Sequence, residues 1–144
     1  MNLARVELSS SDDFPERFDV GFTPVREALG AELIGCSVYE IGPGKRLWPY
    51  HYHLGNEEWL IVVSGTPTLR TPDGLRELRA GDVVGFPDGE AGAHTLANES
   101  EAAARVAVFS TRRPGIVVYP DSDKIGMWRK YFRSSDAVDY WHGE

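Results

Sequence analysis

Three histidines and one glutamate stand at spacings that suit a metal site: His51, His53, Glu58 and His94. Side chains two residues apart on an extended strand point to the same face, so His51 and His53 can bind one ion together. Glu58 opens the apolar run 58–63, where a buried carboxylate needs a partner such as a divalent cation. The alternative is that Glu58 is solvated at the end of its strand. If the four side chains converge, they surround a metal.

The segments that carry these candidates predict short strands. The run 58–63 has the length and apolar character of a buried strand that begins at Glu58. Alternation from His94 places Leu96 and Asn98 on the same face as that histidine. Each candidate ligand therefore lies at or near the start of a predicted strand.

Glycine, proline and aspartate recur between these apolar segments. This spacing of turns predicts an all-β sandwich or barrel. Residues 68–71 and 75–78 predict a hairpin, because Asp73 and Gly74 between them suit the left-handed backbone of a tight turn. Residues 103–109 and 116–119 predict two further strands.

The chain resembles the cupin superfamily in two motifs that combine turn glycines with metal ligands. The matching residues are Gly44, His51, His53, Glu58 and Gly65 in the first motif, and Gly81, Pro87, Gly89, His94 and Asn98 in the second. The spacing to Gly65 favours Glu58 over its neighbour Glu57 as the ligand. The loop between Gly89 and His94 is longer than the family pattern.

The resemblance implies an all-β fold, the double-stranded β-helix or jelly roll of a small single-domain metal-binding cupin. We expect the barrel over residues 31–120, after an extended N-terminal arm over residues 1–30. The aromatic content of residues 121–144 predicts that this C-terminal tail packs on the barrel or on a partner subunit. Together with the habit of the family, the tail suggests a homodimer. We expect His142, which lies in the tail, to be exposed.

Three imidazoles and one carboxylate suit a divalent transition metal, and Mn, Fe, Ni and Zn all stay open as its identity. An octahedral ion would keep open positions for water, substrate or dioxygen. A tetrahedral zinc could be closed by the same protein ligands and be purely structural. The coordination number therefore separates a catalytic from a structural site.

Strand parity also predicts an apolar substrate pocket beside the metal, since residues two apart share a face. The predicted pocket residues are Leu60, Val62, Phe86 and Leu96. Such a lining favours a small, partly hydrophobic chelating ligand. By the same parity, Trp48 and Tyr50 should face away from the histidines if their strand is regular, and Trp59 should oppose Glu58.

The resemblance leaves several functions open, because cupins include dioxygenases, decarboxylases, isomerases and proteins without catalytic activity. We expect a metal-dependent enzyme, an oxidoreductase, lyase or isomerase, that acts on a small organic acid or carbonyl compound. The alternatives are a module that binds or senses a small ligand through the same metal, and a barrel that the metal only stabilises. No catalytic residue beyond the metal ligands can be assigned.

The 144 residues carry a net charge of −7, which argues against nucleic acid or an anionic membrane as a partner and leaves a small molecule as the expected ligand. Cys36 is the single cysteine, and its apolar surroundings predict a buried side chain. No signal pattern and no run of membrane-spanning length is present in the sequence, so we expect a cytoplasmic location.

Overall fold

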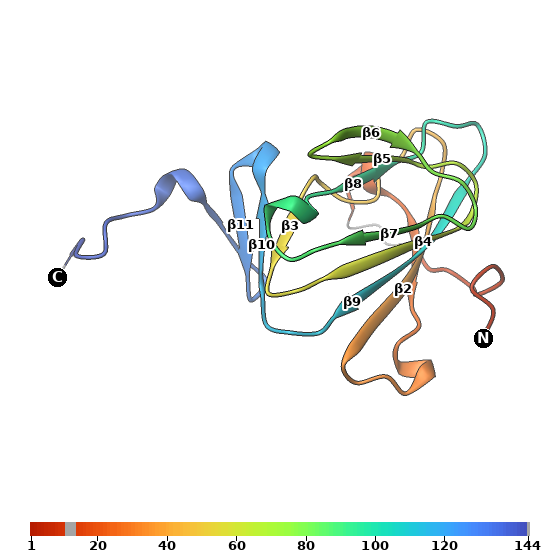
Figure 1. Ribbon diagram of the computed structural model, residues 1–144, viewed down its shortest axis with the longest axis horizontal. Helices are drawn as coiled ribbons and strands as arrows, with labels where there is room; N and C mark the ends of the chain where they lie inside the picture. Colours follow the sequence, from red (N-terminus) through yellow and green to blue (C-terminus); the bar gives the residue numbers. More distant parts are fainter. Residues whose placement is uncertain (11–13, 144) are drawn as a thin grey trace.

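The computed structural model describes residues 1–10 and 14–143, whose strands form three antiparallel sheets (Figure 1). In spatial order, the largest sheet contains β1 (Gly21–Pro24), β2 (Ile34–Ile41), β9 (Ala104–Thr111), β4 (Glu58–Ser64) and β7 (Val83–Phe86). The strands β2 and β9 lie far apart in the sequence and pair over their whole length. Long-range pairing therefore holds this sheet together.

The two smaller sheets complete the barrel and extend it. One contains β6 (Gly74–Glu77), β5 (Thr68–Thr71) and β8 (Thr95–Ala97); the other contains β12 (Lys130–Arg133), β11 (Lys124–Met127), β10 (Ile116–Tyr119) and β3 (Tyr52–Leu54). The helical segments of the described residues are short 3-10 turns: η1 (Glu16–Phe18), η2 (Glu27–Leu29), η3 (Glu90–Gly92), η4 (Pro120–Ser122) and η5 (Ser134–Asp136). This is the all-β jelly roll that the sequence predicts.

The main hydrophobic core lies inside the barrel, and β4 shows how alternation builds it. Leu60 and Val62 are buried in the core, whereas Trp59 between them is 60% exposed. The strand therefore places Glu58 on the inner face, and the prediction that Trp59 opposes it is confirmed. The hairpin of β5 and β6 is confirmed as well.

A second, smaller apolar cluster covers the outer face of the large sheet. Its buried members include Cys36 and Val38 of β2, against which Leu3, Val6 and Leu8 pack. The predicted burial of Cys36 is confirmed, and burial raises the pKa of its thiol. This packing ties the first residues of the chain to the barrel.

The two predicted terminal segments both contribute strands. Within the predicted arm, β1 pairs with β2 as an edge strand. Within the predicted tail, β11 and β12 form a hairpin on β10, and the residues after η5 are exposed and extend away from the barrel (Figure 1). His142 is exposed there, as predicted. Residues 11–13 of the arm and residue 144 of the tail lie outside the described residues.

No helix among the described residues has both the length and the apolar character needed to cross a membrane.

Candidate metal centre

His51 and His94 face each other across an antiparallel bridge between two chain segments far apart in the sequence. Each backbone N–H donates to the carbonyl of the other residue, from His51 to His94 at 3.1 Å and from His94 to His51 at 2.8 Å. Side chains directly opposite each other on such a pair point to one side of the sheet. The centroids of the two imidazole rings are accordingly 4.7 Å apart.

Glu58 brings its carboxylate to the two histidines of the neighbouring segments. Its Oε2 lies 3.1 Å from Nε2 of His53 and 3.4 Å from Nε2 of His94. Potential ligand atoms of His51, His53 and Glu58 all lie within 4.8 Å of one another. The structure thus brings all four predicted residues together, with His94 joining the group through its contact with Glu58.

Backbone carbonyls fix the orientation of two of the imidazoles. Nδ1 of His51 lies 2.9 Å from the carbonyl oxygen of Pro49, and Nδ1 of His94 lies 2.9 Å from that of Gly92. A carbonyl oxygen only accepts hydrogen bonds, so each Nδ1 carries the proton and donates it. Each Nε2 therefore keeps its lone pair, in the tautomer that metal-binding histidines adopt.

The long loop before His94 forms the turn η3 and supplies one of these carbonyls. Gly92 packs so closely on Pro87 that a Cβ at this position would lie 1.9 Å from the Pro87 carbonyl oxygen. Only glycine fits there without moving the backbone. The extra residues therefore keep His94 in place rather than displacing it.

Two buried polar atoms at the centre lack a well-directed hydrogen bond from any described residue: Oε2 of Glu58 and Nε2 of His94. Buried polar atoms are normally satisfied, because each unsatisfied one costs about 1–3 kcal/mol. A divalent cation between these atoms would satisfy both. The donor set and this pair of orphaned atoms fit a transition metal.

The charge states of the cluster also suit metal binding. Burial, together with the neighbouring His94 and His53, lowers the pKa of His51 to about 4. Burial also lowers the pKa of His94. Burial alone would raise the pKa of Glu58, but His53 and the other imidazoles outweigh it and hold that pKa below its ordinary value. At neutral pH the imidazoles of His51 and His94 are therefore neutral and the carboxylate of Glu58 is ionised.

Aromatic rings enclose the cluster, and sequence reasoning missed two of them. Tyr119 stacks on His51 with ring centroids 5.8 Å apart. Trp48 meets the rings of His51 and His94 edge-on, at 5.8 and 6.1 Å. The prediction that Trp48 faces away from the histidines is wrong, because residues 47–50 form no regular strand. Pro49, which cannot donate a ladder hydrogen bond, was the available signal.

The four predicted pocket residues belong to the packed core. Leu60, Val62 and Leu96 are 0–1% exposed and Phe86 is 4% exposed, so they offer a ligand almost no surface. Phe86 stacks on His94 at 3.6 Å between centroids and holds that ring in place. Their role in binding a substrate stays a prediction.

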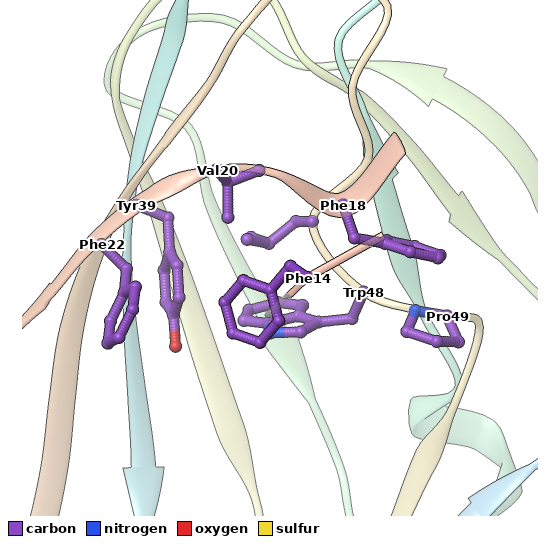
Figure 2. A pocket seen from close by; sticks show the side chains of 8 residues that line it. Phe14, Phe18, Val20, Phe22, Tyr39, Trp48 and Pro49 are labelled. Carbon is purple, nitrogen blue, oxygen red and sulfur yellow. The ribbon is translucent and has the colours of Figure 1, made fainter. Parts of the chain in front are cut away.

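An open cavity, lined in part by Trp48, lies between the N-terminal segment and the barrel (Figure 2). Its volume is about 270 Å³. Apolar and aromatic side chains line it: Phe14, Phe18, Val20, Phe22, Tyr39, Leu47, Trp48 and Pro49. We call it the aromatic cavity. Trp48 connects it to the metal cluster, since the indole contacts both.

The fold recurs in solved structures. A proposed sugar phosphate isomerase from Acidithiobacillus ferrooxidans ATCC 23270 is 24% identical, with a TM-score of 0.83 over 95% of this chain and 91% of that one. A sugar phosphate isomerase from Silicibacter pomeroyi DSS-3 is 23% identical, with a TM-score of 0.80 over 96% and 95%. A predicted oxalate decarboxylase from Thermotoga maritima is 16% identical, with a TM-score of 0.63 over 76% and 96%. At these identities the likeness concerns the fold.

A search of curated proteins found no match. The model of the cupin domain family matches residues 37–110, a range that contains His51, His53, Glu58 and His94. This match spans half of the sequence and both predicted motifs, so the chain belongs to the cupin domain family.

Proposed function

We propose that this cupin is a metal-dependent enzyme, of the oxidoreductase, lyase or isomerase type, that acts on a small organic acid or carbonyl compound. The observation that carries the proposal is the pair of buried, unsatisfied atoms, Oε2 of Glu58 and Nε2 of His94, beside imidazoles held in the metal-binding tautomer. A purely structural cluster would gain stability by satisfying these atoms within the protein.

The ligands of the proposed centre are Nε2 of the three histidines and a carboxylate oxygen of Glu58. A divalent Mn, Fe, Ni or Zn ion bound there would supply a Lewis acid for a carbonyl or carboxylate group of the substrate. The carbonyls of Pro49 and Gly92 keep His51 and His94 oriented. Phe86 and Tyr119, stacked on the imidazoles, restrict the access of water.

The substrate class follows from the surroundings and from the neighbours. The aromatic cavity beside Trp48 offers an apolar surface for the organic part of a small ligand. The solved structures with this fold are named for sugar phosphates and for oxalate, which are small anions. A small anionic compound with a metal-binding carbonyl or carboxylate group suits both observations.

Elemental analysis of protein loaded separately with each candidate metal tests the centre. We expect about one ion per chain in the unmodified protein. Each of the substitutions His51→Ala, His53→Ala, Glu58→Ala and His94→Ala should lower this occupancy markedly, since each removes one ligand. The exposed His142 serves as the matched control, and His142→Ala should leave occupancy unchanged. Full occupancy in all four ligand variants would overturn the assignment.

Turnover assays with the metal-loaded protein separate an enzyme from a sensor. Candidate 2-oxo acids, dicarboxylates and sugar phosphates are supplied with each metal, while oxygen uptake and product formation are followed. We expect turnover with one metal and one substrate class, and its loss in His53→Ala. Saturable binding without turnover under every metal would instead favour the ligand-sensing alternative.

A further inference from the structure

A second cavity, of about 330 Å³, shares its wall with the aromatic cavity and has a different chemistry. Four cationic side chains and a single carboxylate line it: Arg17, Arg46, Arg70, Lys124 and Asp121. We call it the cationic pocket. The chain as a whole carries a net charge of −7, whereas the side chains of this pocket carry a net positive charge.

The cations come from segments that are distant in the sequence. Arg17 lies in η1, Arg46 precedes β3, Arg70 lies in β5 and Lys124 begins β11. The backbone N–H of Arg46 donates to the carbonyl of Arg17 at 2.7 Å, which holds the N-terminal segment at the pocket. Tertiary folding therefore builds the pocket, in contrast to a run of charges along one solvated strand.

The one carboxylate of the pocket is already engaged. Asp121 forms a two-pronged ion pair with Arg70, with N–O distances of 2.5 and 3.0 Å. The guanidinium of Arg70 also lies over the ring of Tyr50, 3.9 Å from its centroid, so its position is fixed. Asp121 thus neutralises Arg70, and it forms no ion pair with the other three cationic side chains of the pocket.

Arg17, Arg46 and Lys124 have no carboxylate within 4.0 Å among the described residues. Like charges around one pocket repel each other. An oxyanion bound inside the pocket would offset this repulsion and accept charge-assisted hydrogen bonds from the cationic side chains. Guanidinium groups present paired donors that match the oxygens of a phosphate. Arg17, Arg46 and Lys124 together suit a doubly charged phosphate better than a singly charged carboxylate.

The pocket lies next to the proposed metal centre. Phe18, Trp48 and Pro49 line both the cationic pocket and the aromatic cavity, and Figure 2 shows all three around that cavity. Trp48 in turn contacts the rings of His51 and His94. A ligand with its anionic group in the pocket therefore has its organic part beside Trp48, one ring away from the metal ligands.

We propose that the cationic pocket binds the phosphate group of a small organic phosphate. If the protein is the metal enzyme proposed above, organic phosphates are its substrate class. Only this identification of the ligand as the substrate rests on the proposed function. Binding of the phosphate group itself requires no metal.

Calorimetric titration of metal-free protein with inorganic phosphate and with fructose 6-phosphate tests the pocket. We expect saturable binding of both probes that weakens as salt is added, because salt screens exposed charges. Arg46→Ala and Lys124→Ala should each weaken binding about tenfold, the effect of losing one charge-assisted hydrogen bond, whereas Arg46→Lys should retain most of it. Circular dichroism confirms that each variant is folded.

Two controls make the outcome decisive. Arg79→Ala removes an equally positive side chain that is 80% exposed and lies outside the pocket, and it should leave phosphate affinity unchanged. His53→Ala should keep phosphate binding even though it loses metal. The proposal is overturned if metal-free protein shows no saturable binding, if Arg79→Ala weakens binding as much as Arg46→Ala, or if His53→Ala abolishes it. Metal occupancy, measured separately, reports on the proposed function alone.

Discussion

The metal cluster and the cationic pocket both include contacts with Trp48, but Glu58 and His94 hold buried polar atoms that no described residue hydrogen-bonds, whereas the cationic pocket is open to solvent. His94 is completely buried; Arg17 and Arg46 are exposed. Backbone bridges and stacked rings fix the first group, and long flexible side chains form most of the second. The indole of Trp48 contacts both environments.

This difference shows how burial decides the strength and the sensitivity of a charged site. In the buried cluster, small changes in packing or protonation lower the free energy of unfolding by about 1 kcal/mol or more, because water cannot hydrate the affected groups. In the cationic pocket, water and salt screen each charge, so single changes cost little stability. Effects on unfolding should therefore be large and dependent on pH on one side, and small and dependent on salt on the other.

The largest expected effect is a cavity made in the core beside the cluster. Leu96→Ala should lower the free energy of unfolding by about 2–5 kcal/mol, because it removes packed methyl groups from a fully buried site. Arg46→Ala, in the cationic pocket, should change it by less than about 0.5 kcal/mol. Urea unfolding of both variants measures the contrast. A loss below about 1 kcal/mol for Leu96→Ala would instead support a loosely packed ligand pocket around this residue.

The next effect is the pH dependence of metal-free protein. Folding lowers the pKa of His51 from 6.5 to about 4, so the unfolded chain binds more protons between these values. The free energy of unfolding should therefore have its full value above pH 6.5. It should fall as the pH drops toward 4, and the loss due to His51 should total about 3 kcal/mol. The lowered pKa of Glu58 acts in the same direction in acid.

Urea titrations at several pH values measure this slope, and His51→Gln should flatten it by removing the titrating group. His142→Gln, at an exposed site, should leave the slope as it is. An unchanged slope in His51→Gln would show that the buried cluster does not govern acid stability.

A smaller effect is expected for the ion pair of Arg70 and Asp121 in the cationic pocket. The two side chains are 41% and 50% exposed, so their coupling in a double-mutant cycle should be about 0–1 kcal/mol. Added salt should reduce it further. The cycle uses Arg70→Ala, Asp121→Ala and the double variant. A coupling above about 2 kcal/mol, insensitive to salt, would place this pair with the buried side of the comparison.

The smallest effect on unfolding is expected beyond both sites, in the tail. Val138, Tyr140 and Trp141 are 65%, 84% and 72% exposed, and exposed apolar side chains gathered in one short segment suit contact with a partner subunit. We expect the full chain to be a homodimer by light scattering. A chain that ends at Asp136 should lose association while its free energy of unfolding at low concentration changes by less than about 0.5 kcal/mol. A monomeric full chain would contradict this prediction.

Much of the barrel could be predicted because strand alternation and turn chemistry are local. The period of two placed Leu60 and Val62 inside and Trp59 outside, and the structure agrees. The hairpin followed from Asp73 and Gly74 in the same way. The rule failed at Trp48, where Pro49 interrupts the strand and removes the alternation on which the prediction depended.

The residue types of the cluster and its strand parity were already contained in the order of amino acids, since they depend on neighbours along one strand. The preference for Glu58 over Glu57 came from the spacing to Gly65 in the motif that resembles the cupins. The meeting of His94 with His51 and Glu58 depended on which strands pair, and so did the positions of Tyr119 and of the four cations around the cationic pocket. Such contacts join segments far apart in the chain. Strand alternation and turn chemistry alone are compatible with many different pairings of the strands. Only the closed barrel selects one of them, because there alone every sheet finds a partner for its apolar face.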